Sequence, residues 1–134
     1  MFSIMLIDDQ PAILAGMTTL IEDTGMARVI ATATDGDSAI EIALERKPDL
    51  ILLDVSLGRV SGVDIARKLK QKWQDARLLA VSAHASSVYV RGMINAGASG
   101  YMLKDNGPQE IVDAITTIMQ GGQWIGEGLS YDPA

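Results

Sequence analysis

The chain alternates short apolar runs with longer segments of helical period, and several of the runs end in a charged residue. Asp8 and Asp9 follow the first run. Asp54 follows a second, and Lys104 follows a third. This alternation is typical of successive strand-helix-strand units on a parallel sheet. The carboxyl ends of such strands meet at one edge of the sheet, so we expect three carboxylates and one ammonium to line a single crevice.

A cluster of three carboxylates requires compensating positive charge. Two unit charges about 4 Å apart repel by about 4 kcal/mol at an effective dielectric near 20, so three repulsions total on the order of 10 kcal/mol. A small domain is stable by only about 5 to 15 kcal/mol. Oxygen ligands with no Cys or His nearby suit a hard cation, and Mg²⁺ fits better than Zn²⁺ because it keeps several waters. The sequence therefore predicts a site for Mg²⁺ and a phosphoryl group.

Composition narrows the class of protein. A chain of 134 residues is long enough for one domain with a real core. It has no cysteine, which excludes disulfides, thiolate metal sites and a cysteine nucleophile. A net charge of -6 weighs against nucleic-acid binding by this chain itself. No apolar stretch reaches spanning length and Met1 leads directly into a strand, so we expect a cytoplasmic protein without membrane contact.

The periodicity predicts five strands and five helices. The expected strands lie near residues 3–7, 28–32, 50–54, 77–82 and 100–103. The expected helices lie near residues 11–23, 37–46, 62–73, 86–96 and 108–120. We expect residues 1–120 to form one domain. Residues 121–134 are rich in glycine and lack periodicity, which indicates the start of a linker or a tail.

The complete set of site residues resembles one known family. An acidic pair, an acceptor-like carboxylate, a hydroxyl ending the fourth strand and a lysine ending the fifth stand in that family's order and spacing: Asp8, Asp9, Asp54, Ser82 and Lys104. The chain thus resembles the receiver domain of bacterial two-component response regulators over residues 3–120. Residues 96–105 look like its NarL/FixJ branch. The resemblance implies an α/β flavodoxin-like receiver fold, with a five-stranded parallel sheet of order 2-1-3-4-5 and helices on both faces.

The resemblance also implies a role for each site residue. Asp54 would accept a phosphoryl group from a phosphohistidine of a sensor histidine kinase. Asp9 would ligate Mg²⁺ directly, Asp8 would act largely through water, and the backbone carbonyl of Ser56 would complete the protein ligands. Lys104 would neutralise the incoming phosphoryl oxygens, which suits a loose transition state that needs positioning and charge stabilisation.

A switch would follow from phosphorylation. Ser82 would hydrogen-bond the new phosphate, and Tyr101 would turn from an exposed to a buried rotamer. The implied protein is a phosphoacceptor that assists its own phosphorylation and dephosphorylation, not an enzyme. It would form a phosphorylation-dependent homodimer. DNA would be bound only through a helix-turn-helix domain beyond this chain, as part of a transcriptional regulator.

The sequence departs from the usual pattern of the family in three places. The family commonly has Met-Pro where this chain has Leu57 and Gly58, so we expect a looser loop after the acceptor. Asp105 replaces a proline that often forms a cis bond after the lysine. Ser56 and His84 occupy two positions linked to the dephosphorylation rate, which leaves that rate open.

Other interpretations remain open at this stage. The expected fourth helix has apolar residues on more than one face, which fits either a partner surface formed with the fifth strand and fifth helix or loose patterning. Tyr101 could be a plain core aromatic, and His84 an exposed loop residue. Alternative functions are a stand-alone receiver acting by protein contact, a receiver that is not phosphorylated, a flavin-binding module, and a Mg²⁺-dependent aspartyl phosphatase. The last usually needs an acid where Ser56 stands.

Overall fold

A computed structural model describes residues 1–57, 60–106, 108–126 and 128–129 of the chain. The strands are β1 Phe2–Ile7, β2 Ala27–Ala33, β3 Leu50–Asp54, β4 Ser56–Leu57, β5 Val60–Ser61, β6 Leu78–Ser82, β7 Gly100–Leu103 and β8 Trp124–Ile125. The helices are α1 Pro11–Asp23, α2 Gly36–Arg46, α3 Gly62–Lys72, α4 Ser87–Asn95 and α5 Pro108–Met119.

The main sheet is parallel and has the order β2-β1-β3-β6-β7-β8. Its first five strands confirm the predicted order 2-1-3-4-5. The prediction of five strands is wrong by one, because residues 124–125 add the short strand β8 beside β7. Two residues carry no alternation of apolar and polar side chains, so the sequence pattern gives no signal for such a strand. A small hairpin of β4 and β5 lies outside the main sheet.

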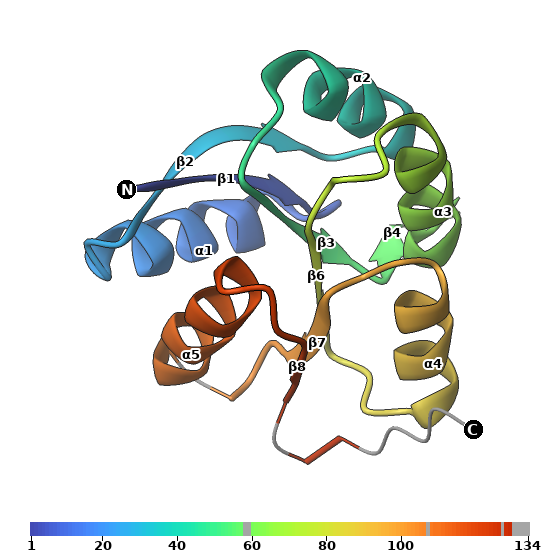
Figure 1. The fold of residues 1–134 in the computed structure, drawn as a ribbon. Helices are drawn as coiled ribbons and strands as arrows, with labels where there is room; N and C mark the ends of the chain where they lie inside the picture. The colour runs from blue at the N-terminus through green and yellow to red at the C-terminus, as the bar shows by residue number, and fades with distance from the viewer. Residues whose placement is uncertain (58–59, 107, 127, 130–134) are drawn as a thin grey trace.

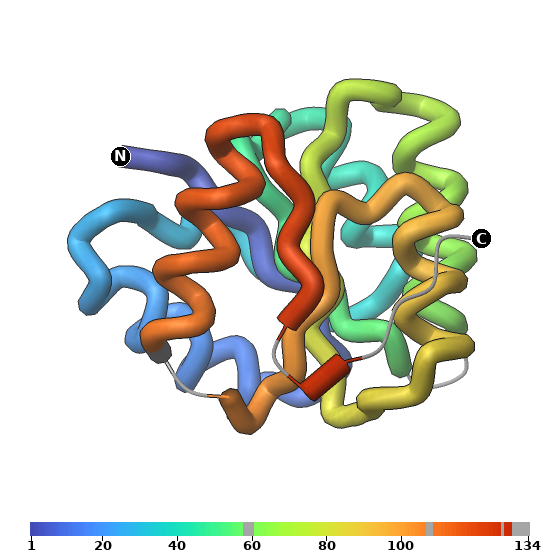
Figure 2. Tube along the Cα trace, turned by 60° about the horizontal axis from the view of Figure 1, so that its bottom comes forward, coloured from blue at the N-terminus to red at the C-terminus, as the bar shows by residue number. Residues whose placement is uncertain are grey.

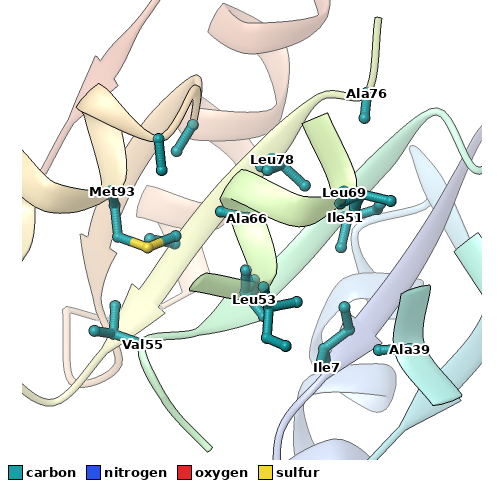
Figure 3. Packing of buried hydrophobic residues seen from close by; sticks show 14 of the residues in the cluster. Ile7, Ala39, Ile51, Leu53, Val55, Ala66, Leu69, Ala76, Leu78 and Met93 are labelled. Atoms are coloured by element: carbon teal, nitrogen blue, oxygen red, sulfur yellow. The ribbon is translucent and has the colours of Figure 1, made fainter. Parts of the chain in front are cut away.

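Helices cover both faces of the sheet. Helices α1 and α5 lie on one face, and α2, α3 and α4 lie on the other (Figure 1). Each face has its own apolar core. One core packs residues of α2, α3 and α4 against the sheet, and the other packs residues of α1 and α5. Figure 3 shows Leu53 and Ile7 of the sheet facing Ala39 of α2, with Ala66 and Leu69 of α3 nearby.

Local signals in the sequence explain where several helices begin and end. The side chains of Asp35, Ser61 and Ser86 accept hydrogen bonds from backbone N–H groups in the first turns of α2, α3 and α4. Helix α2 ends at Arg46, and the next residue, Lys47, has a φ of 46° just before Pro48. Gly97 takes a φ of 107° after α4, where a residue with a Cβ is disfavoured.

The strands bring the site residues to the side of the sheet where their carboxyl ends meet. Strands β3 and β6 are buried along their whole length, as expected for strands covered on both faces. They end at Asp54 and Ser82. Strand β1 ends one residue before Asp8, and β7 ends one residue before Lys104. Among the residues described, no helix has the length and apolar character needed to cross a membrane.

Candidate functional site

Three carboxylates gather where β1 and β3 end. Asp8, Asp9 and Asp54 each offer an oxygen within 4.8 Å of the other two. Asp8 and Asp54 are buried, whereas Asp9 is exposed. The crevice predicted from the sequence is therefore present, with its three acidic residues side by side.

Lys104 supplies the positive charge at this cluster. Its Nζ lies 2.9 Å from Asp8 Oδ2 and 3.4 Å from Asp54 Oδ2. Both distances are short enough for ion pairs between largely buried groups, where screening by solvent is weak. One ammonium among three carboxylates still leaves an excess of negative charge, so the site can accept a further cation.

The carboxylates of Asp8 and Asp9 differ in their hydrogen bonds. Asp8 Oδ1 accepts the backbone N–H of Gln10 at 3.0 Å, and its Oδ2 accepts Lys104. Within the described part of the chain, no hydrogen bond or ion pair engages the carboxylate of Asp9. Asp9 is thus the freer ligand, whereas both oxygens of Asp8 already have protein partners.

Burial and charge both act on the ionisation of the site. Burial raises the pKa of Asp54, and the negative charge of Asp8 raises it further. The N–H of Ser56 and the ammonium of Lys104 oppose this rise but do not cancel it. Burial lowers the pKa of Lys104, yet its hydrogen bond to Asp8 and the charge of Asp54 outweigh burial and raise it. The lysine thus stays charged beside a carboxylate that ionises at a cost.

The donor set fits Mg²⁺. The ion binds oxygen ligands at about 2.1 Å in octahedral geometry, so its ligand oxygens lie roughly 3 to 4 Å apart. The carboxylate oxygens of Asp8, Asp9 and Asp54 lie within 4.8 Å of one another, which is close to that spacing. They can hold the ion after a small contraction or through intervening waters, which Mg²⁺ retains readily. An acidic cluster of this kind binds Mg²⁺ in receiver domains.

A cavity of about 410 Å³ lies over the cluster. Its lining combines expected site residues with others that the sequence pattern does not single out: Asp9, Gln10, Ile13, Asp54, Ser56, Ala83, His84 and Lys104. Gln10 and Ile13 come from the start of α1, directly after the acidic pair. Their closeness to Asp9 along the chain is the only signal that could have indicated them.

Ser82, His84 and Tyr101 form a hydrogen-bonded group beside this cavity. Ser82 is fully buried, and its Oγ accepts the N–H of His84 at 2.9 Å. Tyr101 is also fully buried and donates its hydroxyl to the carbonyl of His84 at 2.8 Å. Burial raises the pKa of Tyr101, while a hydrogen bond with Ser82 lowers it. The predicted change of rotamer at Tyr101 stays a prediction.

The His84 side chain is exposed, as the sequence predicts, and its ring lies 5.1 Å from that of Tyr89 in α4. Two apolar residues of that helix, Val88 and Tyr89, are exposed by 75% and 40%. Val90 and Met93 are fully buried in the core. The apolar character on several faces of α4 thus comes from two buried residues and from two that face solvent.

The segment after Asp54 is held closely. The N–H of Ser56 donates to Asp54 Oδ1 at 3.2 Å, and the N–H of Gly62 donates to the carbonyl of Val55 at 2.7 Å. Leu57 is buried in β4, although we expect a loose loop here, and Gly58 lies outside the described residues. Among the described residues no peptide bond is cis, consistent with Asp105 in place of a proline.

Comparison with known proteins gives one consistent result. The family model for the response regulator receiver domain matches residues 4–116. Transcriptional regulatory protein DegU of Brevibacillus brevis is 33% identical over 129 residues, which are 96% of this chain and 55% of DegU. Nitrate/nitrite response regulator protein NarP of Escherichia coli strain K12 is 34% identical over 129 residues, covering 96% of this chain and 60% of NarP.

A solved structure agrees with these matches. The crystal structure of a two-component response regulator of the LuxR family from Aurantimonas sp. SI85-9A1 superposes with a TM-score of 0.88 at 34% identity. The superposition covers 92% of this chain and 88% of that one. The chain spans 55% and 60% of the length of DegU and NarP, whose names are those of regulatory proteins.

Proposed function

The chain belongs to the response regulator receiver domain family, and on that premise we propose that it is a switch controlled by phosphorylation of Asp54. One observation carries the proposal. Asp54 is a buried carboxylate beside a cavity, with Lys104 at 3.4 Å and two further carboxylates within 4.8 Å. A structural aspartate would not need this concentration of charge around it.

The reaction is transfer of a phosphoryl group between two side chains. An Asp54 oxygen would form a bond to phosphorus while the bond from phosphorus to the imidazole nitrogen of a kinase histidine breaks. The ammonium of Lys104, which pairs with Asp54 before the reaction, would then also pair with the phosphoryl oxygens. Asp9, Asp54 and the carbonyl of Ser56 would hold Mg²⁺ directly, with Asp8 acting through water. When bound, the ion supplies positive charge to the phosphoryl oxygens, which carry most of the charge in a loose transition state.

The partners follow from this role and from the family. We propose a sensor histidine kinase as the phosphoryl donor and a phosphorylation-dependent homodimer as one output, in the cytoplasm. The exposed residues Val88 and Tyr89 of α4 support a protein contact on that face. DegU is named as a transcriptional regulatory protein, and this chain spans 55% of its length, so we propose that DNA is reached through a further domain outside this chain. The domain would assist its own phosphorylation and dephosphorylation without turning over a separate substrate.

The direct test is chemical phosphorylation of the purified chain. With acetyl phosphate or phosphoramidate and Mg²⁺, we expect intact mass spectrometry to show one added phosphoryl group. Asp54→Asn should abolish the addition because an amide oxygen is a poor nucleophile. Asp23→Asn, which removes the same charge from an exposed position at the end of α1, should leave it unchanged. Equal labelling of Asp54→Asn, or labelling undiminished by EDTA, would refute the proposed function.

A further inference from the structure

The strand β8 forms one edge of the main sheet, beside β7, whose carboxyl end leads to Lys104. Figure 2 shows this part of the chain running along β7 after the turn that follows α5. The N–H of Trp124 donates to the carbonyl of Ser99 at 3.1 Å, and the N–H of Gly126 donates to the carbonyl of Tyr101 at 2.9 Å. We call residues 124–126 the edge strap.

The edge strap fits closely against its neighbours. A Cβ at Gly126 would lie 3.2 Å from Met102 Cα and in contact with the carboxylate of Glu110. A Cβ at Gly100 would lie 2.7 Å from the carbonyl oxygen of Trp124. Glu110 is itself buried and accepts the indole N–H of Trp124 at 3.2 Å. Close backbone approach and a buried hydrogen bond distinguish this contact from a chain end resting on the surface.

The strap lies directly beside Tyr101. The register pairs Tyr101 with Ile125, so their side chains share one face of the sheet. Ile125 and Leu129 pack against the apolar cluster that contains Tyr101, whose own exposed fraction is zero. Undocking of the strap would remove Ile125 from this cluster and open the core beside Tyr101. A docked strap and a buried Tyr101 therefore favour each other.

Tyr101 also contacts the segment that borders the cavity. Its hydroxyl binds the carbonyl of His84, and His84 lines the cavity over Asp54. The N–H of His84 in turn binds Ser82 Oγ at the end of β6. A group on Asp54 that attracts the Ser82 hydroxyl would draw this segment inward. The hydrogen bond from Tyr101 to the His84 carbonyl would then hold the ring more firmly in its buried position.

From this chain of contacts we propose that the edge strap is coupled to the phosphoryl site through Tyr101 and His84. Occupancy of Asp54 tightens docking of the strap on β7, and docking of the strap favours occupancy of Asp54. The coupling is reciprocal because both events bias the same position of Tyr101. This inference rests on the proposed function for its ligand. The contacts between strap, Tyr101 and His84 can nevertheless be tested without any ligand.

The first experiment uses the ligand-free chain. Tyr101→Phe keeps the ring and removes only the hydroxyl that binds His84. We expect the amides of Trp124 and Gly126 to exchange hydrogen at least about threefold faster by NMR, whereas Gln123→Ala, at an exposed position beside the strap, should leave them unchanged. Unchanged exchange at both amides in Tyr101→Phe would overturn the coupling.

The second experiment adds Mg²⁺ and beryllofluoride, a stable mimic of a phosphoryl group. We expect exchange at Trp124 and Gly126 to slow about fivefold, at the lower end of typical coupling between sites. Gly126→Ala, whose methyl group displaces the strap, should weaken beryllofluoride binding by a similar factor. Binding that perturbs the amides around Asp54 but not those of the strap would disprove the coupling alone. Absence of any binding would refute the proposed function and leave the Tyr101→Phe experiment to decide on the strap.

Discussion

Asp54 is ionised at a cost to the folded state. Burial and the charge of Asp8 raise its pKa, and Lys104 only partly offsets them. A raised pKa means that the folded chain binds the proton more tightly than the unfolded chain does. The stability that this group contributes is therefore present below its unfolded pKa, near 4, and is lost as pH rises through the folded pKa. At neutral pH the ionised carboxylate of Asp54 therefore lowers the free energy of unfolding.

Removing the charge of Asp54 should restore the part of the free energy of unfolding that its ionisation costs. In EDTA at pH 7 we expect Asp54→Asn to raise the free energy of unfolding by on the order of 1 kcal/mol, because the variant no longer buries an ionised carboxylate and no longer places it beside Asp8. The gain should shrink toward zero as pH falls below about 3, where Asp54 is protonated in both the folded and the unfolded chain. Urea denaturation across this range measures both effects. Asp23→Asn is the charge-matched control, and a destabilised Asp54→Asn at pH 7 would show that the bond to Lys104 outweighs burial.

Ser82 carries the hydroxyl that we expect to hydrogen-bond a new group on Asp54. We expect Ser82→Ala still to bind beryllofluoride with Mg²⁺, because the variant leaves the carboxylates and Lys104 in place. The shift changes at Tyr101 and Met93 should fall by about half or more, since no hydroxyl then pulls residues 82–84 inward. NMR at saturating beryllofluoride provides the comparison. Shift changes equal to those of the parent would contradict this prediction and leave Ser82 only its structural hydrogen bond with His84.

At the scale of elements, α3 begins unusually close to β3. Gly62 starts the helix, and a Cβ there would lie 2.7 Å from Val55 Cα and in contact with the carbonyl of Asp54. We expect Gly62→Ala to lower the free energy of unfolding by about 2 kcal/mol, because the helix must move away from the strand that carries Asp54. It should also weaken Mg²⁺ binding. Thermal denaturation and a Mg²⁺ titration measure the two effects.

Gly16 offers the matched control for that substitution. It lies exposed inside α1, where a Cβ would meet nothing within 4 Å. Gly16→Ala should therefore raise the free energy of unfolding by about 0.5 to 1 kcal/mol, through the higher helix propensity of alanine. If the two variants had the same effect, the contact of Gly62 with β3 would not be a constraint on the fold.

Sequence periodicity predicts the larger elements well and the smaller ones poorly. Helix α1 begins and ends where the pattern places it, and the other four helices differ by at most a residue at each end. Long amphipathic segments carry enough turns to mark their own bounds. Strand β8 and the hairpin of β4 and β5 have two residues in each strand, so they depend on contacts with distant parts of the chain.

At the scale of the whole molecule, topology explains why the site could be predicted at all. Asp8, Asp54 and Lys104 are far apart in the sequence, and a parallel sheet places all three at one edge. Which oxygen contacts which donor could not be predicted. Among the described residues both oxygens of Asp8 are engaged and those of Asp9 are not, which depends on the direction of each side chain after the strand ends. The contact of the edge strap with the buried Tyr101 could not be predicted either, because the two residues of β8 carry no periodicity in the sequence.

The overall charge sets a final expectation about DNA. Eleven basic residues against seventeen acidic ones give a net charge of -6, so the chain as a whole repels a DNA backbone. We expect residues 1–134 to select no sequence from a pool of random duplexes and to bind none with a Kd below about 10 µM at physiological salt. Fluorescence anisotropy with and without beryllofluoride tests this in both states of the switch. Enrichment of particular sequences, with affinity that falls steeply as salt rises, would place DNA recognition within this chain and remove the reason for a separate output domain.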